Sequence, residues 1–321
     1  MAARVTIKSI AQDLGISHMT VSRALSNHPN VQEETRRAII AHADKLGYVR
    51  SAAAATMRGD GSRIIGLLLP NILNDFYARL ANALALACEQ SGYHLIIHLT
   101  NDDINTETRD LQRLREVEAK AVLMVPAPGS TAKSTPLLAN MQVIQLIRQR
   151  PMSQPANTIV VQDHDAIVAA VAHLAQQGHR KIGFIGAHPD MSSGRERFAA
   201  FHQGLKQTSL DLNPDIVITD TPNFDMGRQS AQRLLSDSSA TALVCAGVEI
   251  SNGALNAMLE SGRTDFGFVG YGDPPFYAWL NGGVSTIHLP VSEIAEQALT
   301  LLQEDTRPSD TYGYAAKLVV R

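Results

Sequence analysis

The N-terminal stretch from Thr6 to Leu25 carries the pattern that most restricts how this chain can fold. Its first apolar side chains recur with the i, i+3, i+4 and i+7 spacing of an amphipathic helix, at Ile7, Ile10, Ala11 and Leu14. Gly15 follows at once and suits the left-handed position that ends a helix. Ser17 is a good N-cap for a second helix, in which Val21 and Leu25 face inward. A helix, a tight glycine turn and a second capped helix predict a helix-turn-helix that binds DNA.

The start of the second helix leaves polar side chains pointing outward, where they can reach a major groove. We expect His18, Met19 and Arg23 to read bases, because arginine can fork onto guanine and a methionine can contact a thymine methyl. For Met19 the alternative is a packing role between helices. Phosphate contacts set the register of the protein on DNA, and we expect them from Ser17, Thr20, Ser22, Thr35 and Tyr48.

A third helix is predicted from near Val31 to Leu46, with Glu33 and Glu34 in its first turn and Gly47 as its terminator. Its expected buried side consists of Ile39, Ile40, Ala43 and Leu46. Three helices of this size make a small headpiece with a thin core.

Charge is distributed unevenly along the chain. Residues 1–63 hold nine Lys and Arg against five Asp and Glu, whereas the remaining residues hold 19 against 26. A basic N-terminal region before an acidic body suits DNA binding at one end, although chance scatter in a short segment is the alternative. Cys88 and Cys245 are the only cysteines, which fits a reducing cytosol. We expect no signal peptide and no membrane span, and therefore a cytoplasmic protein.

From residue 64 onward, short apolar runs alternate with amphipathic segments. The runs are Ile64–Leu69, Tyr93–Leu99, Ala121–Val125, Val143–Ile147, Lys181–Ile185, Asp215–Thr219, Ala242–Cys245 and Phe266–Gly270. The amphipathic segments include Phe76–Ser91, Asn105–Glu118, Asp165–Gln177 and Gly227–Asp237. Such alternation predicts an α/β core of doubly wound parallel sheets in two units, with a ligand cleft at the carboxyl ends of the strands.

Several motifs along the chain resemble the lac repressor/galactose repressor (LacI/GalR) family of transcriptional regulators. They are Thr-Ile-Lys-Ser-Ile-Ala from Thr6, Val-Ser-Arg-Ala-Leu-Ser-Asn from Val21, Glu-Thr-Arg from Glu34, Leu-Gly-Tyr from Leu46 and Gly-His-Arg-Lys-Ile-Gly-Phe-Ile-Gly from Gly178. The resemblance implies a helix-turn-helix headpiece at 1–50, a hinge helix and linker at 51–63, and a core at 64–321 like type I periplasmic binding proteins. It further implies a first lobe at about 64–160 and 290–321, which includes the final strand Lys317–Val320, and a second lobe at about 161–289.

The resemblance assigns the alanine-rich segment before Arg58 to a hinge helix that pairs with its copy in the DNA minor groove. Ala54 and Met57 are the expected minor-groove residues, with Met57 replacing the usual wedging leucine. The alternative is a plain alanine-rich linker.

By resemblance, an effector would bind in the interlobe cleft, and the expected contacts are Phe76, Tyr77, Arg148, Arg197, Phe224 and Asp273. Where relatives have Asn-Asp to grip sugar hydroxyls, this chain has Gly247 and Val248. Two converging arginines favour a small polar effector that carries negative charge, such as a sugar acid or a phosphorylated sugar. In the alternative, these arginines form internal salt bridges with Asp163, Glu196 or Asp273.

Other chemistry finds little support in the sequence. No phosphate-binding glycine loop, metalloprotease motif or nucleophile elbow occurs, and His94 and His98 lack a third metal ligand nearby. We therefore expect no catalytic residues, no metal and no cofactor. The alternatives are an enzyme or a solute-binding protein, and the latter predicts a secretion signal and no helix-turn-helix. The sequence favours a homodimeric transcription regulator, most simply a repressor, that binds a near-palindromic operator in double-stranded DNA.

Overall fold

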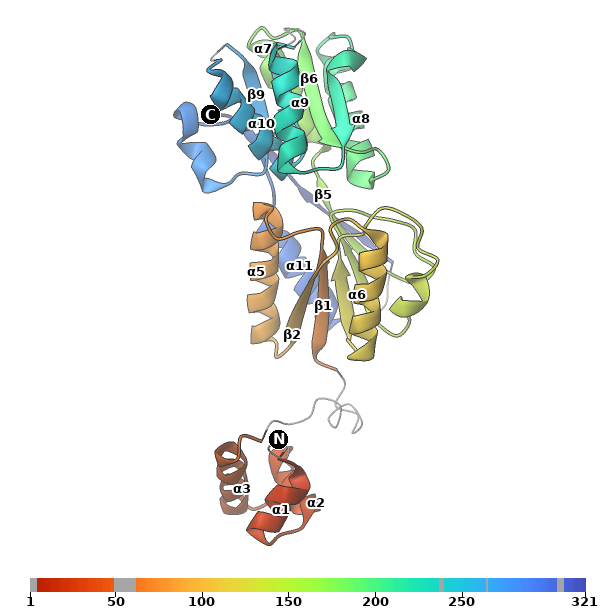
Figure 1. Cartoon of the computed structure of the whole chain (residues 1–321), viewed down its shortest axis with the longest axis vertical. Coiled ribbons are helices and arrows are strands. Elements are labelled where there is room, and N and C mark those ends of the chain that lie inside the picture. Colours follow the sequence, from red (N-terminus) through yellow and green to blue (C-terminus); the bar gives the residue numbers. More distant parts are fainter. Residues whose placement is uncertain (1–4, 49–61, 237–239, 264, 305–308) are drawn as a thin grey trace. The chain divides into compact units, whose positions relative to one another are not determined.

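The computed structural model describes residues 5–48, 62–236, 240–263, 265–304 and 309–321. Contacts divide the chain into two compact units, Met1–Ser62 and Arg63–Arg321. The first unit is a helical headpiece and the second is an α/β core with two lobes (Figure 1). The expected hinge helix, with Ala54 and Met57, lies outside the described residues.

The described part of the headpiece consists of α1 (Ile7–Leu14), α2 (His18–Leu25) and α3 (Glu33–Lys45). A reciprocal capping box starts α1, because the Thr6 hydroxyl accepts the Ser9 N–H and the Ser9 hydroxyl accepts the Thr6 N–H. Gly15 ends α1 at φ 63°, and the Ser17 hydroxyl caps α2 by accepting the Thr20 N–H at 3.1 Å. The predicted helix-turn-helix is thus formed by local signals at both of its ends.

The headpiece core is small and apolar. Its buried residues are Ile10, Ala11, Val21, Ala24, Val31, Ile39 and Ala43. The expectation that Ile40 is buried is wrong, since 41% of its surface is exposed. Successive helical residues differ by about 100° around the axis, so Ile40 turns to solvent when Ile39 faces the core.

The first lobe is a parallel sheet that, within the described residues, has six strands in the order β11-β5-β4-β3-β1-β2. Its strands are β1 (Ile64–Leu69), β2 (His94–Leu99), β3 (Ala121–Met124), β4 (Gln142–Leu146), β5 (Asn157–Gln162) and β11 (Thr311–Ala315). Helices α5 (Asp75–Gln90) and α11 (Val291–Gln303) cover one face, and α6 (Ile104–Glu116) covers the other (Figure 1). Buried on both faces, β1 reads as a continuous apolar run.

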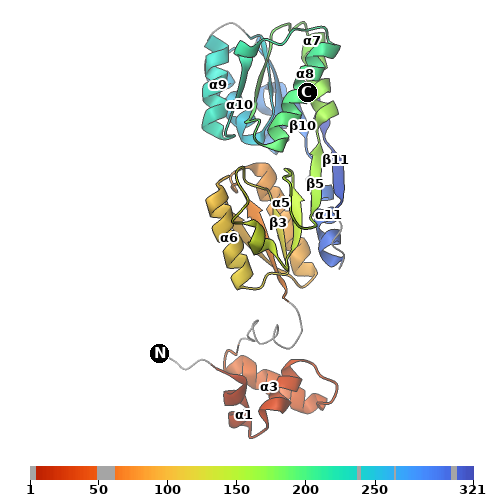
Figure 2. The same ribbon diagram turned by 90° about the vertical axis from the view of Figure 1, so that its right-hand side faces the viewer.

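The second lobe is a mixed sheet in the order β12-β10-β9-β8-β6-β7, in which the edge strand β12 is antiparallel to β10 and the other pairs are parallel. Its strands are β6 (Ile182–Ala187), β7 (Val217–Asp220), β8 (Ala242–Cys245), β9 (Gly267–Tyr271), β10 (Thr286–His288) and β12 (Lys317–Val319). Helices α7 (His164–Gln176) and α8 (Ser192–Gln207) pack on one face, with α9 (Phe224–Ser236) and α10 (Val248–Ser261) on the other (Figure 2). Short 3₁₀ helices occur at Thr135–Leu138, Pro214–Ile216, Pro275–Ala278 and Leu280–Gly282. None of the helices traced in the described ranges is both long and apolar enough to cross a membrane.

The described chain passes between the lobes after β5, between β10 and α11, and between β11 and β12. The predicted assignment of the final strand to the first lobe is wrong. β11 pairs with β5, but the chain then crosses at Ala316, and β12 pairs antiparallel with β10 in the second sheet. The first crossing follows Gln162, close to the expected lobe boundary at about residue 161. The residues of a short edge strand do not show which sheet the strand joins, because the strands pair through backbone hydrogen bonds.

Helices α9 and α10 approach closely through two glycines. A Cβ placed on Gly253 would lie 2.0 Å from the Phe224 carbonyl oxygen, and one on Gly227 would lie 2.3 Å from the Ile250 carbonyl oxygen. Backbone atoms cannot move aside as a side chain can, so only glycine allows this packing distance.

We expect Gly253→Ala to lower the free energy of unfolding of the core by about 1–3 kcal/mol or more, because the new methyl group overpacks the α9–α10 contact. Urea denaturation measures the loss. Leu259→Ala on the same helix, where Leu259 is 41% exposed, should change stability much less. Equal effects of the two variants would contradict close packing as the cause.

Candidate DNA-binding surface and interlobe cleft

The recognition helix α2 buries one side and exposes the other. Val21 and Ala24 are buried, whereas His18 and Arg23 are exposed and Met19 is 52% exposed. Met19 and Arg23 stand four residues apart and share a face of the helix. The exposure of Met19 contradicts the alternative packing role, so all three residues expected to read bases are free to contact DNA.

The residues expected to contact phosphate differ in the contacts that they already make within the headpiece. The hydroxyls of Ser17 and Thr20 lie 2.9 Å apart at the N-terminus of α2, and Thr35 is half-buried in the first turn of α3. Tyr48 packs partly against the headpiece core. Sequence reasoning missed Arg36, which donates to the Asn27 side chain and to backbone carbonyls, and so holds the loop between α2 and α3.

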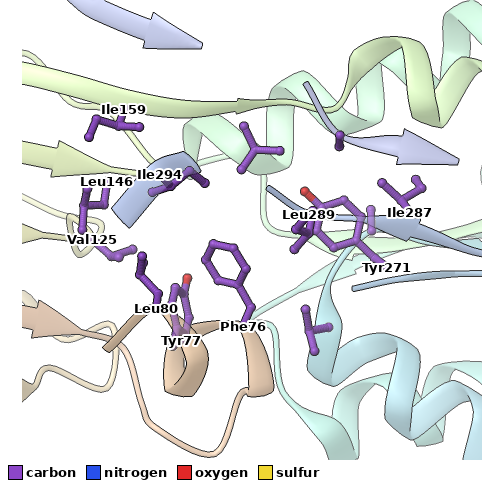
Figure 3. Close-up of a cluster of buried hydrophobic side chains, with 14 of the residues drawn as sticks. Phe76, Tyr77, Leu80, Val125, Leu146, Ile159, Tyr271, Ile287, Leu289 and Ile294 are labelled. Carbon is purple, nitrogen blue, oxygen red and sulfur yellow. The ribbon is translucent and has the colours of Figure 1, made fainter. Parts of the chain in front are cut away.

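The core contains a cleft between its lobes, with a small cavity of about 60 Å³. Its walls come mainly from loops and helix starts at the carboxyl ends of strands in both sheets, as expected for open parallel sheets. The polar and aromatic residues that line it are Asn71, Asn74, Phe76, Tyr77, Asp102, Arg148, Ser193, Arg197, Glu249 and Tyr271. Figure 3 shows Phe76 and Tyr77 on α5 and, on the other side of the view, Tyr271 with Leu289, all within one hydrophobic cluster.

Arg197 is held by a buried set of polar groups. Its Nε donates to Asp163 at 2.6 Å, its Nη1 donates to the Ala246 carbonyl at 3.0 Å, and its guanidinium lies 4.2 Å from the centre of the Tyr271 ring. Burial disfavours the charge of Arg197, but the neighbouring Tyr271 and Asp163 outweigh burial and raise its pKa. For Tyr271, burial acts in the other direction and raises the pKa. The Tyr271 hydroxyl therefore keeps the proton that it donates to Asp163 at 2.5 Å.

Arg148 forms a second internal pair with Asp102, at 2.5 and 3.2 Å. The backbone on both sides of this pair takes left-handed conformations, with Asp102 at φ 55° and Ile147 at φ 67°. At Ile147 the Arg148 N–H donates to the Leu146 carbonyl and closes a γ-turn. A β-branched residue rarely adopts positive φ, at a cost of about 1–3 kcal/mol, and such strain gathers at functional sites. Both side chains of the pair are nearly buried, which fixes Arg148 at the cleft.

Both arginines form internal salt bridges, which is the alternative that the sequence left open. Arg197 pairs with Asp163 as that alternative stated, and Arg148 pairs with Asp102, which it did not include. Glu196 is in neither pair. The charged groups in and directly behind the cleft are therefore two arginines and three carboxylates, because Glu249 lines the cavity as well.

The structure brings four of the six expected effector contacts to this cavity: Phe76, Tyr77, Arg148 and Arg197. Phe224 starts α9, is 41% exposed and does not line the cavity. Asp273 instead forms an ion pair with Arg321 at 2.8 Å, beside His288, and lines a separate cavity of about 260 Å³. The sequence did not identify Asp102, Tyr271, Glu249 or Asn71, although Glu249 directly follows the departure at Gly247 and Val248.

The comparisons with known proteins agree with this geometry. Residues 6–51 match "Bacterial regulatory proteins, lacI family", and residues 171–321 match "Periplasmic binding protein-like domain". The chain is 27% identical to the HTH-type transcriptional repressor PurR of Haemophilus influenzae (strain PittEE), over 93% of this chain and 90% of PurR. It is also 27% identical to the ribose operon repressor of Haemophilus influenzae (strain ATCC 51907 / DSM 11121 / KW20 / Rd), over 96% and 94% of the two chains.

Among solved structures, the lac repressor dimer bound to operator and the anti-inducer ONPF superposes with a TM-score of 0.83 at 20% identity, covering 99% of this chain and 98% of that chain. A helix-turn-helix followed by a two-lobed periplasmic-binding-protein-like core defines a DNA-binding transcriptional regulator. The chain belongs to the lacI family of bacterial regulatory proteins, which confirms the family and the fold class predicted from the sequence.

We expect Asp163→Asn to destabilise the core by about 3–5 kcal/mol, because it leaves the buried Arg197 charge without its carboxylate. Urea denaturation monitored by circular dichroism measures this loss. The matched control is Glu260→Gln, which removes the partner of Arg228 in a pair that is 40% and 48% exposed. An exposed pair contributes at most about 1 kcal/mol. Similar losses in both variants would show that the buried Asp163–Arg197 pair contributes no more to stability than an exposed pair does.

Proposed function

We propose that the protein is a homodimeric repressor in the cytoplasm that binds a near-palindromic operator and responds to a small polar effector in the interlobe cleft. The observation that carries the DNA-binding site is the exposure of His18, Met19 and Arg23 on a recognition helix whose opposite side is buried. Two such helices from a dimer would occupy successive major-groove half-sites. The cytoplasmic location follows from access to DNA.

Exposed apolar side chains of the first lobe support the homodimer. On α5 and the neighbouring edge strand β2, Leu86 is 53% exposed, Ile97 is 38% exposed and Leu99 is 40% exposed. An edge strand with exposed apolar residues is a natural interface with another chain. The solved lac repressor, whose fold this chain shares, is described as a dimer bound to operator.

The cleft supports effector control because residues from both lobes line it. A ligand that binds there alters the free-energy difference between open and closed lobes, and it can thereby change how two headpieces are spaced. The small polar effector with negative charge that the sequence favours stays a prediction. The pairing of Arg148 and Arg197 with carboxylates weighs against it, since the groups at the cleft then sum to a negative charge.

We expect Arg23→Ala to weaken operator binding by about 1–3 kcal/mol and to relax the preference at one base pair, because a bidentate contact to guanine is lost. Binding-site selection from a random DNA pool, followed by titration of single-base variants, measures both effects. Arg37→Ala on α3, which also removes an exposed arginine, should leave the base preference unchanged. If Arg23→Ala weakens all sequences equally, then Arg23 contacts phosphate and not a base.

Removal of residues 1–62 should abolish DNA retardation and leave ligand binding by the core intact, because the two compact units divide at this position. Gel retardation and calorimetry on the same preparation measure the two properties. Operator binding by the truncated core would contradict the assignment of DNA recognition to the headpiece.

A further inference from the structure

Glu249 is a carboxylate in the cleft that has no cationic partner within the part of the chain that the structure describes. It lies in the first turn of α10, lines the cavity and is half-buried. Its Oε2 accepts a hydrogen bond from Asn71 Nδ2 at 2.9 Å, which joins the second lobe to the first. No Lys, Arg or His among the described residues forms an ion pair with it. Its other oxygen is therefore available to a ligand.

The other charges at the cleft are already balanced within the protein. Asp102 offers both oxygens to Arg148, and Asp163 accepts from Arg197 and from Tyr271. Glu249 accounts for the remaining negative charge. A charge in a confined, partly buried site favours a ligand group of opposite sign, because water screens it less there than at the surface.

The start of α8 also lines the cavity and presents a hydrogen-bond donor. Ser193 is only 7% exposed, and its hydroxyl has no hydrogen-bond partner among the described residues. It stands in the first turn of α8, a helix of 16 residues whose N-terminus has no side-chain cap and no acidic residue in its first turn. A hydroxyl donor and the positive end of a helix favour an oxygen acceptor of the ligand at the start of α8.

We propose that Glu249 makes the cleft selective for an effector that carries a protonated amine. The ammonium group binds the Glu249 carboxylate oxygen that Asn71 leaves free, and an oxygen of the same ligand accepts from Ser193 and Arg197. A hydroxyl could also donate to Glu249, but it would leave the carboxylate charge uncompensated, and hydrogen bonds between charged groups are the stronger ones. This inference rests on the proposed effector control and names the chemical class of the effector.

Glu249 also has a purely structural alternative role. A carboxylate in the first turn of a helix stabilises that helix, and the hydrogen bond with Asn71 could serve only to hold the lobes together. In that case the charge of Glu249 would not affect which ligands bind. The Glu249→Gln variant separates the two roles, because glutamine keeps an oxygen that can accept from Asn71 but loses the charge.

The test uses the full-length protein and matched compound pairs in which an amine replaces a hydroxyl. Amino sugars are paired with their parent sugars, and amino acids are paired with the corresponding 2-hydroxy acids. Thermal shift identifies binders, and calorimetry measures their affinities. We expect binders among the amine members only, and we expect Glu249→Gln to weaken them about 10-fold to 100-fold, as for a charged hydrogen bond.

Glu260→Gln is the control, because it removes a carboxylate from the far end of the same helix, where Glu260 pairs with Arg228. It should leave binding unchanged. Binders confined to the hydroxyl members would overturn the proposal, as would amine binders that Glu249→Gln leaves within about twofold of the unmodified protein. A complete lack of binders in both sets also counts against it. DNA retardation by the same sample then distinguishes this failure from failure of the proposed DNA-binding function.

Discussion

The Asp163 carboxylate organises the core, because it binds two elements of the second lobe at the place where the chain arrives from the first lobe. It follows β5 of the first sheet directly and precedes α7 of the second lobe. There it accepts from Arg197 on α8 and from Tyr271 at the end of β9. These buried hydrogen bonds tie the crossing, two elements of the second lobe and one wall of the cleft into a single arrangement.

The second ion pair of the cleft shows a different way to fix a charge. Arg148 follows a γ-turn at Ile147, and its partner Asp102 itself has a positive φ. The backbone is thus strained at both ends of one salt bridge, and packing elsewhere in the first lobe must compensate for that strain. Together the two pairs turn a cleft with two arginines into one in which carboxylates predominate. This changes the kind of ligand that the site favours.

The sequence predicted most of the local structure correctly, and its errors have common causes. The cap at Ser17 and the glycine at Gly15 were sufficient to define the turn of the helix-turn-helix. Ile40 was misplaced because a broad apolar stripe does not show which of two adjacent residues is buried. In the cleft, the aromatic and arginine positions were found from the resemblance, but Asp102 and Glu249 were not, since neither stands in a recognisable motif.

By itself, the sequence determined the helix-turn-helix, the alternation of strands and helices, and the division into a basic headpiece and an acidic core. These features depend on residue spacing and on caps within a few positions of one another. Only the tertiary structure decided which carboxylate neutralises each arginine, which sheet takes the final strand, and that Glu249 lines the cavity. Those outcomes depend on contacts between residues far apart in the chain. The path of the backbone between the lobes brings these residues together, and no local sequence pattern predicts that path.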